Sequence, residues 1–258
     1  MDLSNKNIIH VKNGDVEYIQ FRRLLEYKDK LAHAYTLKPI DLKNKSKDDI
    51  NYKKICMALG IDNENVIKPT QTHTNNVEIV VPDSKSTDFP DVDGLITNQK
   101  NKILSAVFAD CNSLLLYDPV KNAIGNIHSG WRGTVAKIGE VAVKKMVDVF
   151  GCNPADIICC IGPSIRQCHF EVEDDVKALF LETFKDETII KIGDTKDGKQ
   201  KYYIDAVTAI KNMLIECGLT SSNIIDCGIC TVCNNDILHS YRVYKSEAGR
   251  NGALMCLI

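Results

Sequence analysis

The stretch ILSAVFADCNSLLLYDPVKNAIGNIHSGWRGTVAKIGEVAVKKMVDVFG, residues 103–151, carries the clearest structural pattern of the chain. Its first half contains three short apolar runs, at 103–109, 114–118 and 123–128, which predict strands. Its second half places apolar residues at helical spacing, with Thr134 as the expected N-cap and Gly151 just beyond the C-terminus. The pattern therefore predicts a sheet followed by a helix that covers it.

The flanking segments extend this pattern in both directions. Upstream, strands are predicted at 77–81 and 93–97, and the polar segment 40–54 predicts a loop with a helix start at Ser46 or Asp48. Downstream, we expect a buried strand at 156–162, helices at about 172–184 and 205–217, and strands at 224–232 and 252–258. Sheets flanked by several helices predict a mixed α/β fold in layers, whose strand order one sequence does not define.

The composition restricts the class of protein. A chain of 258 residues with 44% hydrophobic and 26% charged residues suits one soluble domain spanning 1–258. No apolar run approaches the roughly 18 residues of a membrane span, and no secretory signal is recognisable, so we expect a cytoplasmic protein with eleven reduced cysteines. The net charge of −2 gives no long-range attraction to nucleic acid or to a membrane.

Three segments place a metal-ligand residue at the edge of a predicted element. PTQTHTNNV, FADCNSLLLYDP and GNIHSGWRGT contribute His73, Cys111 and His128. Two imidazoles and one thiolate suit zinc, and a site with three protein ligands leaves a fourth position open for catalysis. The alternatives are a surface histidine at 73 and a buried, inert thiol at 111, because the long separations carry no local spacing pattern.

The segment HSGWRGT also predicts an anion site. Gly130 and Gly133 allow a tight turn, Arg132 supplies a cation, and a helix beginning near Thr134 would point free N–H groups outward. These features suit phosphate. The alternative is an ordinary connection from strand to helix, with Arg132 in a surface ion pair.

The C-terminal region holds two further motifs. Residues 227–233 read CGICTVC, but the flanking IIDCGICTV resembles a strand and no fourth cysteine follows nearby, so we expect packing or a turn next to the active site rather than a cluster or redox site. The segment HSYRVYKSEAGRNG then gathers basic and aromatic residues that could bind an anionic substrate or form a solvated turn, namely Tyr241, Arg242, Lys245 and Arg250.

Taken together, the motifs resemble one family. QTHTNNV, DGLIT, ADCNSLLLYDP, IGNIHSGWRGT, IGPSIRQCHFEV, CTVC and HSYRVYKSEAGRNGALMCLI occur in the order seen in the polyphenol oxidase or laccase-like domain family, whose members act as purine nucleoside phosphorylases. The resemblance runs from about Thr70 to the C-terminus. It implies that His73, Cys111 and His128 bind zinc, because the matching histidines and cysteine do so in that family.

The resemblance also implies a fold and a reaction. The fold would be a layered α/β/β/α mixed-sheet fold, like the cysteine-histidine hydrolase domain of the cytotoxic necrotizing factor toxins. The reaction would be phosphate attack on adenosine, inosine or methylthioadenosine. Phosphate would bind to Arg132, the N–H groups around Gly133, Arg242 and Arg250, although Val243 replaces the second arginine that usually follows the tyrosine.

The catalytic residues of the site would be Cys111, His128 and Asp110. Adenosine deamination, by attack of zinc-bound hydroxide on C6, would be a second activity of the same site. Asp110 is the nearest carboxylate in sequence for proton transfer. Its alternative role is that of a hydrogen-bond acceptor at the end of a strand.

Three other functions compete with this interpretation. Cys111 as nucleophile and His128 as base would make a metal-independent thiol hydrolase or amidase. Copper in place of zinc would suit polyphenol oxidation, but six scattered histidines are few for multicopper chemistry. A non-enzymatic zinc domain would close the site with a fourth protein ligand, Cys168 or His169.

Overall fold

The computed structural model describes residues 2–43, 46 and 49–258, and their strands form two large sheets and one small sheet. The first large sheet has the strand order β1 (Ile8–Asn13), β2 (Val16–Phe21), β3 (Leu31–Thr36), β15 (Asn251–Leu257), β7 (Ile103–Phe108) and β4 (Val66–Ile67). The second has the order β14 (Ile224–Asp226), β10 (Ile158–Ile161), β8 (Asn112–Asp118), β9 (Ala123–Ser129), β6 (Gly94–Thr97) and β5 (Val77–Ile79). Both are mixed, since β4 and β7, β5 and β6, and β10 and β14 pair in parallel while the other neighbours are antiparallel.

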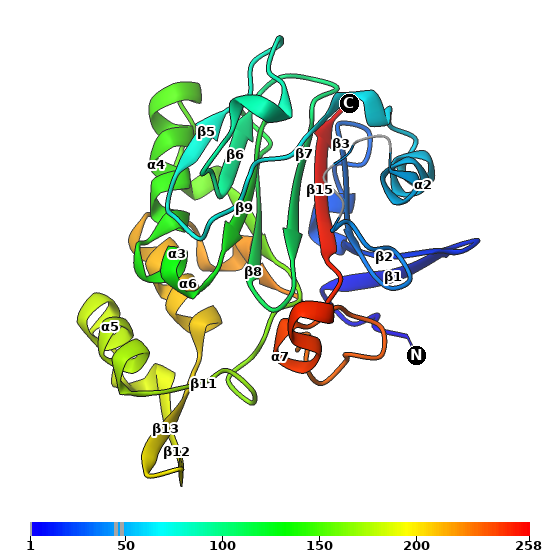
Figure 1. The fold of residues 1–258 in the computed structure, drawn as a ribbon. Helices are drawn as coiled ribbons and strands as arrows, with labels where there is room; N and C mark the ends of the chain where they lie inside the picture. Colours follow the sequence, from blue (N-terminus) through cyan, green and yellow to red (C-terminus); the bar gives the residue numbers. More distant parts are fainter. Residues whose placement is uncertain (1, 44–45, 47–48) are drawn as a thin grey trace.

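The two large sheets pack face to face between layers of helices. Tyr35 and Phe108 from the first sheet share one buried cluster with Leu115 and Tyr117 from the second. Helix α2 (Ile50–Leu59) covers the outer face of the first sheet, and helices α4 (Ile138–Phe150) and α6 (Ala206–Glu216) cover the second (Figure 1). This arrangement confirms the predicted layered, mixed α/β fold.

The third sheet lies at one end of the molecule, beside helix α5 (Figure 1). It contains β11 (Glu171–Val172), β13 (Lys199–Ile204) and β12 (Ile190–Lys196), and α5 spans Asp174–Phe184. Phe170 and Phe180 pack there against Trp131 from the main layers. Two further helices are short, namely α1 (Arg22–Leu25) and α7 (Tyr241–Tyr244).

No helix in the described part of the chain combines the length and apolar character that crossing a membrane requires.

The predicted helix after the central strands is divided in two. A short helix, α3 (Trp131–Val135), precedes α4, and Lys137 at φ 57° turns the chain between them. Thr134 lies inside α3, so its prediction as the N-cap of the long helix was wrong. Its hydroxyl instead hydrogen-bonds with Ser129 Oγ and the Gly130 carbonyl, which ties the turn together. Gly151 caps the C-terminus of α4 at φ 65°, as predicted.

Two other boundaries differ from the prediction. Helix α2 begins at Ile50, because Asp49 accepts a hydrogen bond from the Asn51 N–H as its N-cap; Ser46 is not the start, and Asp48 lies outside the described residues. The strand predicted at 224–232 ends at Asp226. Its partner β10 already ends at Ile161, so the chain has no strand to pair with, and residues 231–237 form a turn.

Candidate active site

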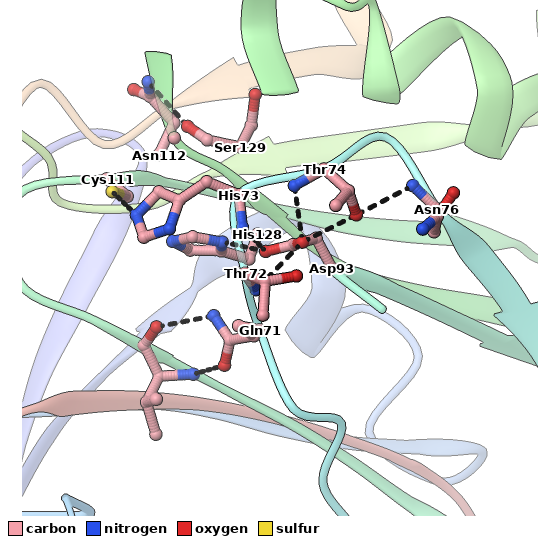
Figure 2. Close-up of polar contacts among 12 residues, drawn as sticks. Gln71, Thr72, His73, Thr74, Asn76, Asp93, Cys111, Asn112, His128 and Ser129 are labelled. Carbon is pink, nitrogen blue, oxygen red and sulfur yellow. Dashed lines mark hydrogen bonds and ion pairs between the residues drawn. The ribbon is translucent and has the colours of Figure 1, made fainter. Parts of the chain in front are cut away.

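The structure brings together the three residues predicted as metal ligands. His73 lies in the loop before β5, Cys111 in the turn between β7 and β8, and His128 near the end of β9 (Figure 2). Their ligand atoms all lie within 4.8 Å of one another, and His73 Nε2 is 3.8 Å from Cys111 Sγ. His128 is buried, His73 is exposed and Cys111 is partly exposed. Such a group can hold a metal ion whose open side faces outward.

Asp93, which no local sequence pattern marks as functional, organises the group of His73, Cys111 and His128. Its buried carboxylate accepts a hydrogen bond from His128 Nδ1 at 2.7 Å, which turns the other ring nitrogen toward the group. The same carboxylate accepts hydrogen bonds from the backbone N–H groups of Thr72, His73 and Thr74 and from the Thr74 hydroxyl (Figure 2). One carboxylate thus orients His128 and the loop that carries His73, an arrangement that is also found behind metal-binding histidines. The only sequence signal for it was its place at the start of DGLIT.

The loop that carries His73 is held in an uncommon backbone conformation. His73 has φ 68°, in the left-handed region that non-glycine residues rarely adopt. The Gln71 side chain fixes the loop by pairing with both the N–H and the carbonyl of Val107 in β7 (Figure 2). Strain of this kind persists where the surrounding contacts determine it and is common at functional sites.

The glycines of HSGWRGT matter here because of close approach. A Cβ on Gly130 would lie 2.6 Å from the His73 ring and 3.2 Å from Cys111 Sγ, and one on Gly133 would lie 2.8 Å from the Thr74 carbonyl oxygen. Only glycine lets this turn pack directly against the group. The turn therefore shapes the group itself. α3 is too short to offer the N-terminal anion site expected from a long helix.

The charges of the group depend on one another. Burial alone would raise the pKa of the Cys111 thiol, but the neighbouring His128 charge and hydrogen bonds from both histidines outweigh burial and lower this pKa to about 6. Burial would lower the pKa of His128, but Cys111 and Asp93 outweigh it and raise this pKa to about 9. Burial also opposes ionisation of Asp93, whose hydrogen bonds from His128 and Thr74 nevertheless lower its pKa to about 2. Cys111 is therefore already a thiolate near neutral pH, the form that binds metals or attacks carbonyl carbon.

The group opens into a pocket of about 450 Å³. This volume is typical of a small-molecule site. Aromatic side chains from three separate segments line it, namely Trp131 in α3, Phe170 just before β11 and Tyr241 in α7. The polar side chains that line the pocket include those of the His73, Cys111 and His128 group and those of Asn112, Ser129, Arg132, Arg242 and Arg250. The pocket can therefore accept a flat aromatic ring together with an anion.

The three arginines that line the pocket are not equivalent. Arg132 is exposed, and its guanidinium lies 4.2 Å from the centre of the Trp131 ring. Within the described residues this guanidinium has no hydrogen-bond or ion-pair partner. The Arg242 guanidinium donates to the carbonyls of His169 and Glu171, and Arg250 donates to those of Ala248 and Gly249. Arg132 is thus the most available cation, while the other two also hold backbone. Lys245, the remaining basic residue of the C-terminal motif, is exposed and does not line the pocket.

Asp110 lines the same pocket but its carboxylate is already engaged. One oxygen accepts from the Thr231 hydroxyl at 2.6 Å and the other from the Arg242 N–H at 2.6 Å. Its carbonyl accepts from the Ile165 N–H, and its φ is 86°. This geometry resembles the strand-end acceptor role more than that of a free proton carrier.

Cys168 and His169 do not complete the first group. They lie instead with Cys230 and Cys233, in a separate cluster of ligand atoms. Among the described residues, no fourth histidine, cysteine or carboxylate joins His73, Cys111 and His128 closely enough to be a ligand. The described part of the chain therefore does not form the closed zinc site that a fourth ligand at this position would give.

Comparison with known proteins agrees with these features. Residues 41–258 match the family model described as "Multi-copper polyphenol oxidoreductase laccase". The chain belongs to this laccase family. A relative, "Purine nucleoside phosphorylase YlmD" of Bacillus subtilis, is 32% identical over 219 residues, which cover 81% of this chain and 75% of the relative.

This laccase-family chain is also similar to a second named relative and to a solved structure. "Adenosine deaminase RL5" of an unknown prokaryotic organism is 29% identical over 203 residues, covering 76% of each chain. The crystal structure of a hypothetical protein, YfiH, from Bacillus licheniformis superimposes with a TM-score of 0.85 over 96% of this chain and 99% of that one, at 23% identity. The structural match establishes the fold, and the relatives are named for enzymes that act on purine nucleosides.

Proposed function

We propose that this chain is a zinc-dependent purine nucleoside phosphorylase for adenosine, inosine and methylthioadenosine, with adenosine deamination as a second activity. The observation that carries the proposal is one shared pocket, because the His73, Cys111 and His128 group, three aromatic residues and three arginines all line it. The names of the relatives support the same substrate class.

The donor set fits one zinc ion better than a multicopper centre. Two imidazoles and a thiolate within 4.8 Å of one another match a zinc site with one open position. The other histidines are engaged elsewhere. His10 contacts Glu17, His33 accepts from the Phe21 N–H, His239 lies against the Ile40 carbonyl and His169 lies with three cysteines. Two histidines at the group are too few for several copper ions.

In phosphorolysis, a phosphate oxygen forms a bond to the anomeric carbon while the bond from that carbon to the purine nitrogen breaks. The electron pair of the broken bond leaves with the base. Zinc, when bound, would polarise the base or activate water at its open position. Arg132 holds the phosphate, since its guanidinium lines the pocket and, although it stacks on Trp131, has no hydrogen-bond or ion-pair partner among the described residues. Phe170 and Tyr241 offer surfaces for the purine. Asp93 keeps His128 oriented throughout.

The test is a product analysis with zinc-loaded protein, adenosine and phosphate. Adenine and ribose 1-phosphate in equal amounts, lost when phosphate is omitted and lost in Cys111→Ala, would support the proposal. Inosine formed without phosphate consumption would make deamination the main activity. Absence of both sets of products with adenosine, inosine and methylthioadenosine would refute the proposal.

The arginines allow a sharper test of phosphate binding. Arg132→Ala should raise the KM for phosphate about 10-fold or more, because it removes a charge-assisted contact of about 1.5–3 kcal/mol, and should change the KM for the nucleoside much less. Arg242→Ala should mainly lower the melting temperature, because its guanidinium binds two backbone carbonyls. A larger phosphate KM for the Arg242 variant than for the Arg132 variant would contradict this assignment.

A second candidate function rests on the chain of contacts from Asp93 through His128 to Cys111. A thiolate beside a histidine that a carboxylate orients is also the arrangement of a thiol hydrolase. Such an enzyme would keep full activity toward amides or thioesters in the presence of a chelator and would lose it on alkylation of Cys111. Chelator-sensitive turnover of nucleosides alone would exclude it.

A further inference from the structure

A second cluster of metal-ligand residues lies outside the pocket. Cys168 and His169 follow β10, and Cys230 and Cys233 follow β14. Their four ligand atoms all lie within 4.8 Å of one another, and the cluster includes exposed as well as buried side chains. We propose that these four residues form a closed, structural zinc site, distinct from the His73, Cys111 and His128 group.

The distances match the edges of a zinc tetrahedron. Bonds of about 2.3 Å to sulfur and about 2.0 Å to nitrogen place two sulfurs about 3.8 Å apart and a sulfur and a nitrogen about 3.5 Å apart. Here Cys168 Sγ lies 3.7 Å from Cys230 Sγ and 3.8 Å from Cys233 Sγ. His169 Nδ1 lies 3.2, 3.8 and 3.5 Å from the sulfurs of Cys168, Cys230 and Cys233. The four ligand atoms are therefore close enough together to bind one zinc ion.

Other uses of these side chains fit less well. A disulfide needs two sulfurs about 2.0 Å apart, which is far shorter than the 3.7 Å between Cys168 and Cys230, and it would leave His169 without a role. An iron–sulfur cluster would spread its ligand sulfurs across several iron atoms, wider than these contacts allow. Three cysteines with one histidine are a common structural zinc set, and Cys230 and Cys233 have the spacing of a zinc ligand pair.

The topology explains why residues so far apart in sequence meet. Strands β10 and β14 pair in parallel, with Cys159 opposite Ile224, so both end at the same edge of the sheet. The pairing continues as an isolated bridge between Ser164 and Cys230. The two loops that leave this edge therefore run side by side and bring their ligands together.

The cluster adjoins the wall of the pocket. Arg242 donates to the carbonyl of His169, and Thr231, next to Cys230, donates to Asp110, which precedes Cys111. An ion at the cluster would hold the two loops together and so fix Arg242 and Asp110 at the pocket. The site has no open position for a substrate, because all four tetrahedral corners are protein atoms.

The decisive experiment is a zinc count on the full-length protein, purified with zinc and then freed of loosely bound ion. The wild-type chain should hold two zinc ions, and Cys233→Ala and Cys111→Ala one each. Cys233→His should restore the second ion, because it replaces one zinc ligand by another. Cys217→Ala is the matched control, since Cys217 is partly exposed and belongs to neither cluster, and it should hold two.

Cobalt gives a second readout that does not depend on altering the new site. Cobalt-loaded Cys111→Ala retains only the new cluster as a thiolate site, so it should show a strong thiolate-to-cobalt absorption. Absence of this absorption, or a zinc content of Cys233→Ala equal to that of the wild type, would overturn the proposal. Both measurements are independent of the proposed phosphorylase activity, so either proposal can fail while the other stands.

Discussion

The two clusters of histidine and cysteine use similar side chains in opposite surroundings. His73 lies in a loop, Cys111 in a turn between strands and His128 near the end of β9. These three residues have a buried carboxylate behind them and open into a pocket of about 450 Å³. Cys168, His169, Cys230 and Cys233 lie on two loops and supply four donors. The difference shows that the number of convergent donors and the space beside them, rather than residue type, separate a site suited to catalysis from one suited to stability.

Removing a ligand of the first group should have the largest effect. We expect His73→Ala to lower kcat/KM for phosphorolysis by about 1,000-fold, because the loss of metal assistance removes several kcal/mol of transition-state stabilisation. Steady-state kinetics with adenosine and phosphate measure it. Cys217→Ala should keep wild-type kinetics as the matched control. Wild-type activity of His73→Ala would show that the first group is not the catalytic one.

Weakening the carboxylate behind the group should have the next largest effect. Asp93→Asn removes the charge that orients His128 and places an amide among four hydrogen-bond donors of residues 72–74. Zinc affinity at the first group should fall by about 10- to 100-fold, as for other partners behind metal-bound histidines. Chelator competition measures it, and the zinc of the second cluster in the same sample serves as an internal control. An equal loss at both sites would mean general unfolding instead.

Crowding the first group should have a smaller effect. In Gly130→Ala, the new methyl group would lie 2.6 Å from the His73 ring and 3.2 Å from Cys111 Sγ, so the ring must shift from its position beside Cys111. The backbone itself accepts alanine, because Gly130 has φ −67°. We expect zinc affinity to fall about 10-fold at the first group alone, which is the loss typical of changing a residue that positions a metal ligand. A crystal structure of the variant with an unmoved His73 would refute the steric argument.

His33 is a buried histidine outside both clusters, so it shows how stability depends on pH without any metal ligand. Replacing it should change stability at neutral pH less than the three variants above change activity or zinc affinity. Burial lowers the pKa of His33 to about 3. Between its unfolded pKa near 6.5 and this value, the unfolded chain binds a proton that the folded chain does not, so the free energy of unfolding falls by about 1.4 kcal/mol per pH unit as pH falls.

The variant His33→Gln keeps a hydrogen-bond acceptor for the Phe21 N–H but cannot titrate. Urea unfolding at several values between pH 7 and pH 4 should therefore show a shallower loss of stability in this variant. Identical slopes in the variant and the wild type would assign the acid sensitivity to other groups, such as the metal ligands.

Local patterns predicted the elements well and their connections poorly. The strands of residues 77–128, the helices near 172–184 and 205–217, and the final strand follow from periodicity, and all were confirmed. Thr134 was misplaced because its hydroxyl bonds within the turn of α3. The strand from 224 ends at Asp226 because its partner strand ends at Ile161, directly opposite. That residues 1–258 form a single domain stays a prediction.

The sequence by itself determined the apolar periodicity, the absence of a long apolar run and the ordered motifs that contain His73, Cys111, His128 and Arg132. Only the tertiary structure decided that Asp93 joins two of those motifs, that Arg242 binds backbone, and that Cys168 and His169 meet Cys230 and Cys233. The reason is physical. Periodicity reports which face of each element is buried, whereas the parallel pairing of β10 with β14 sets which distant loops leave the same edge.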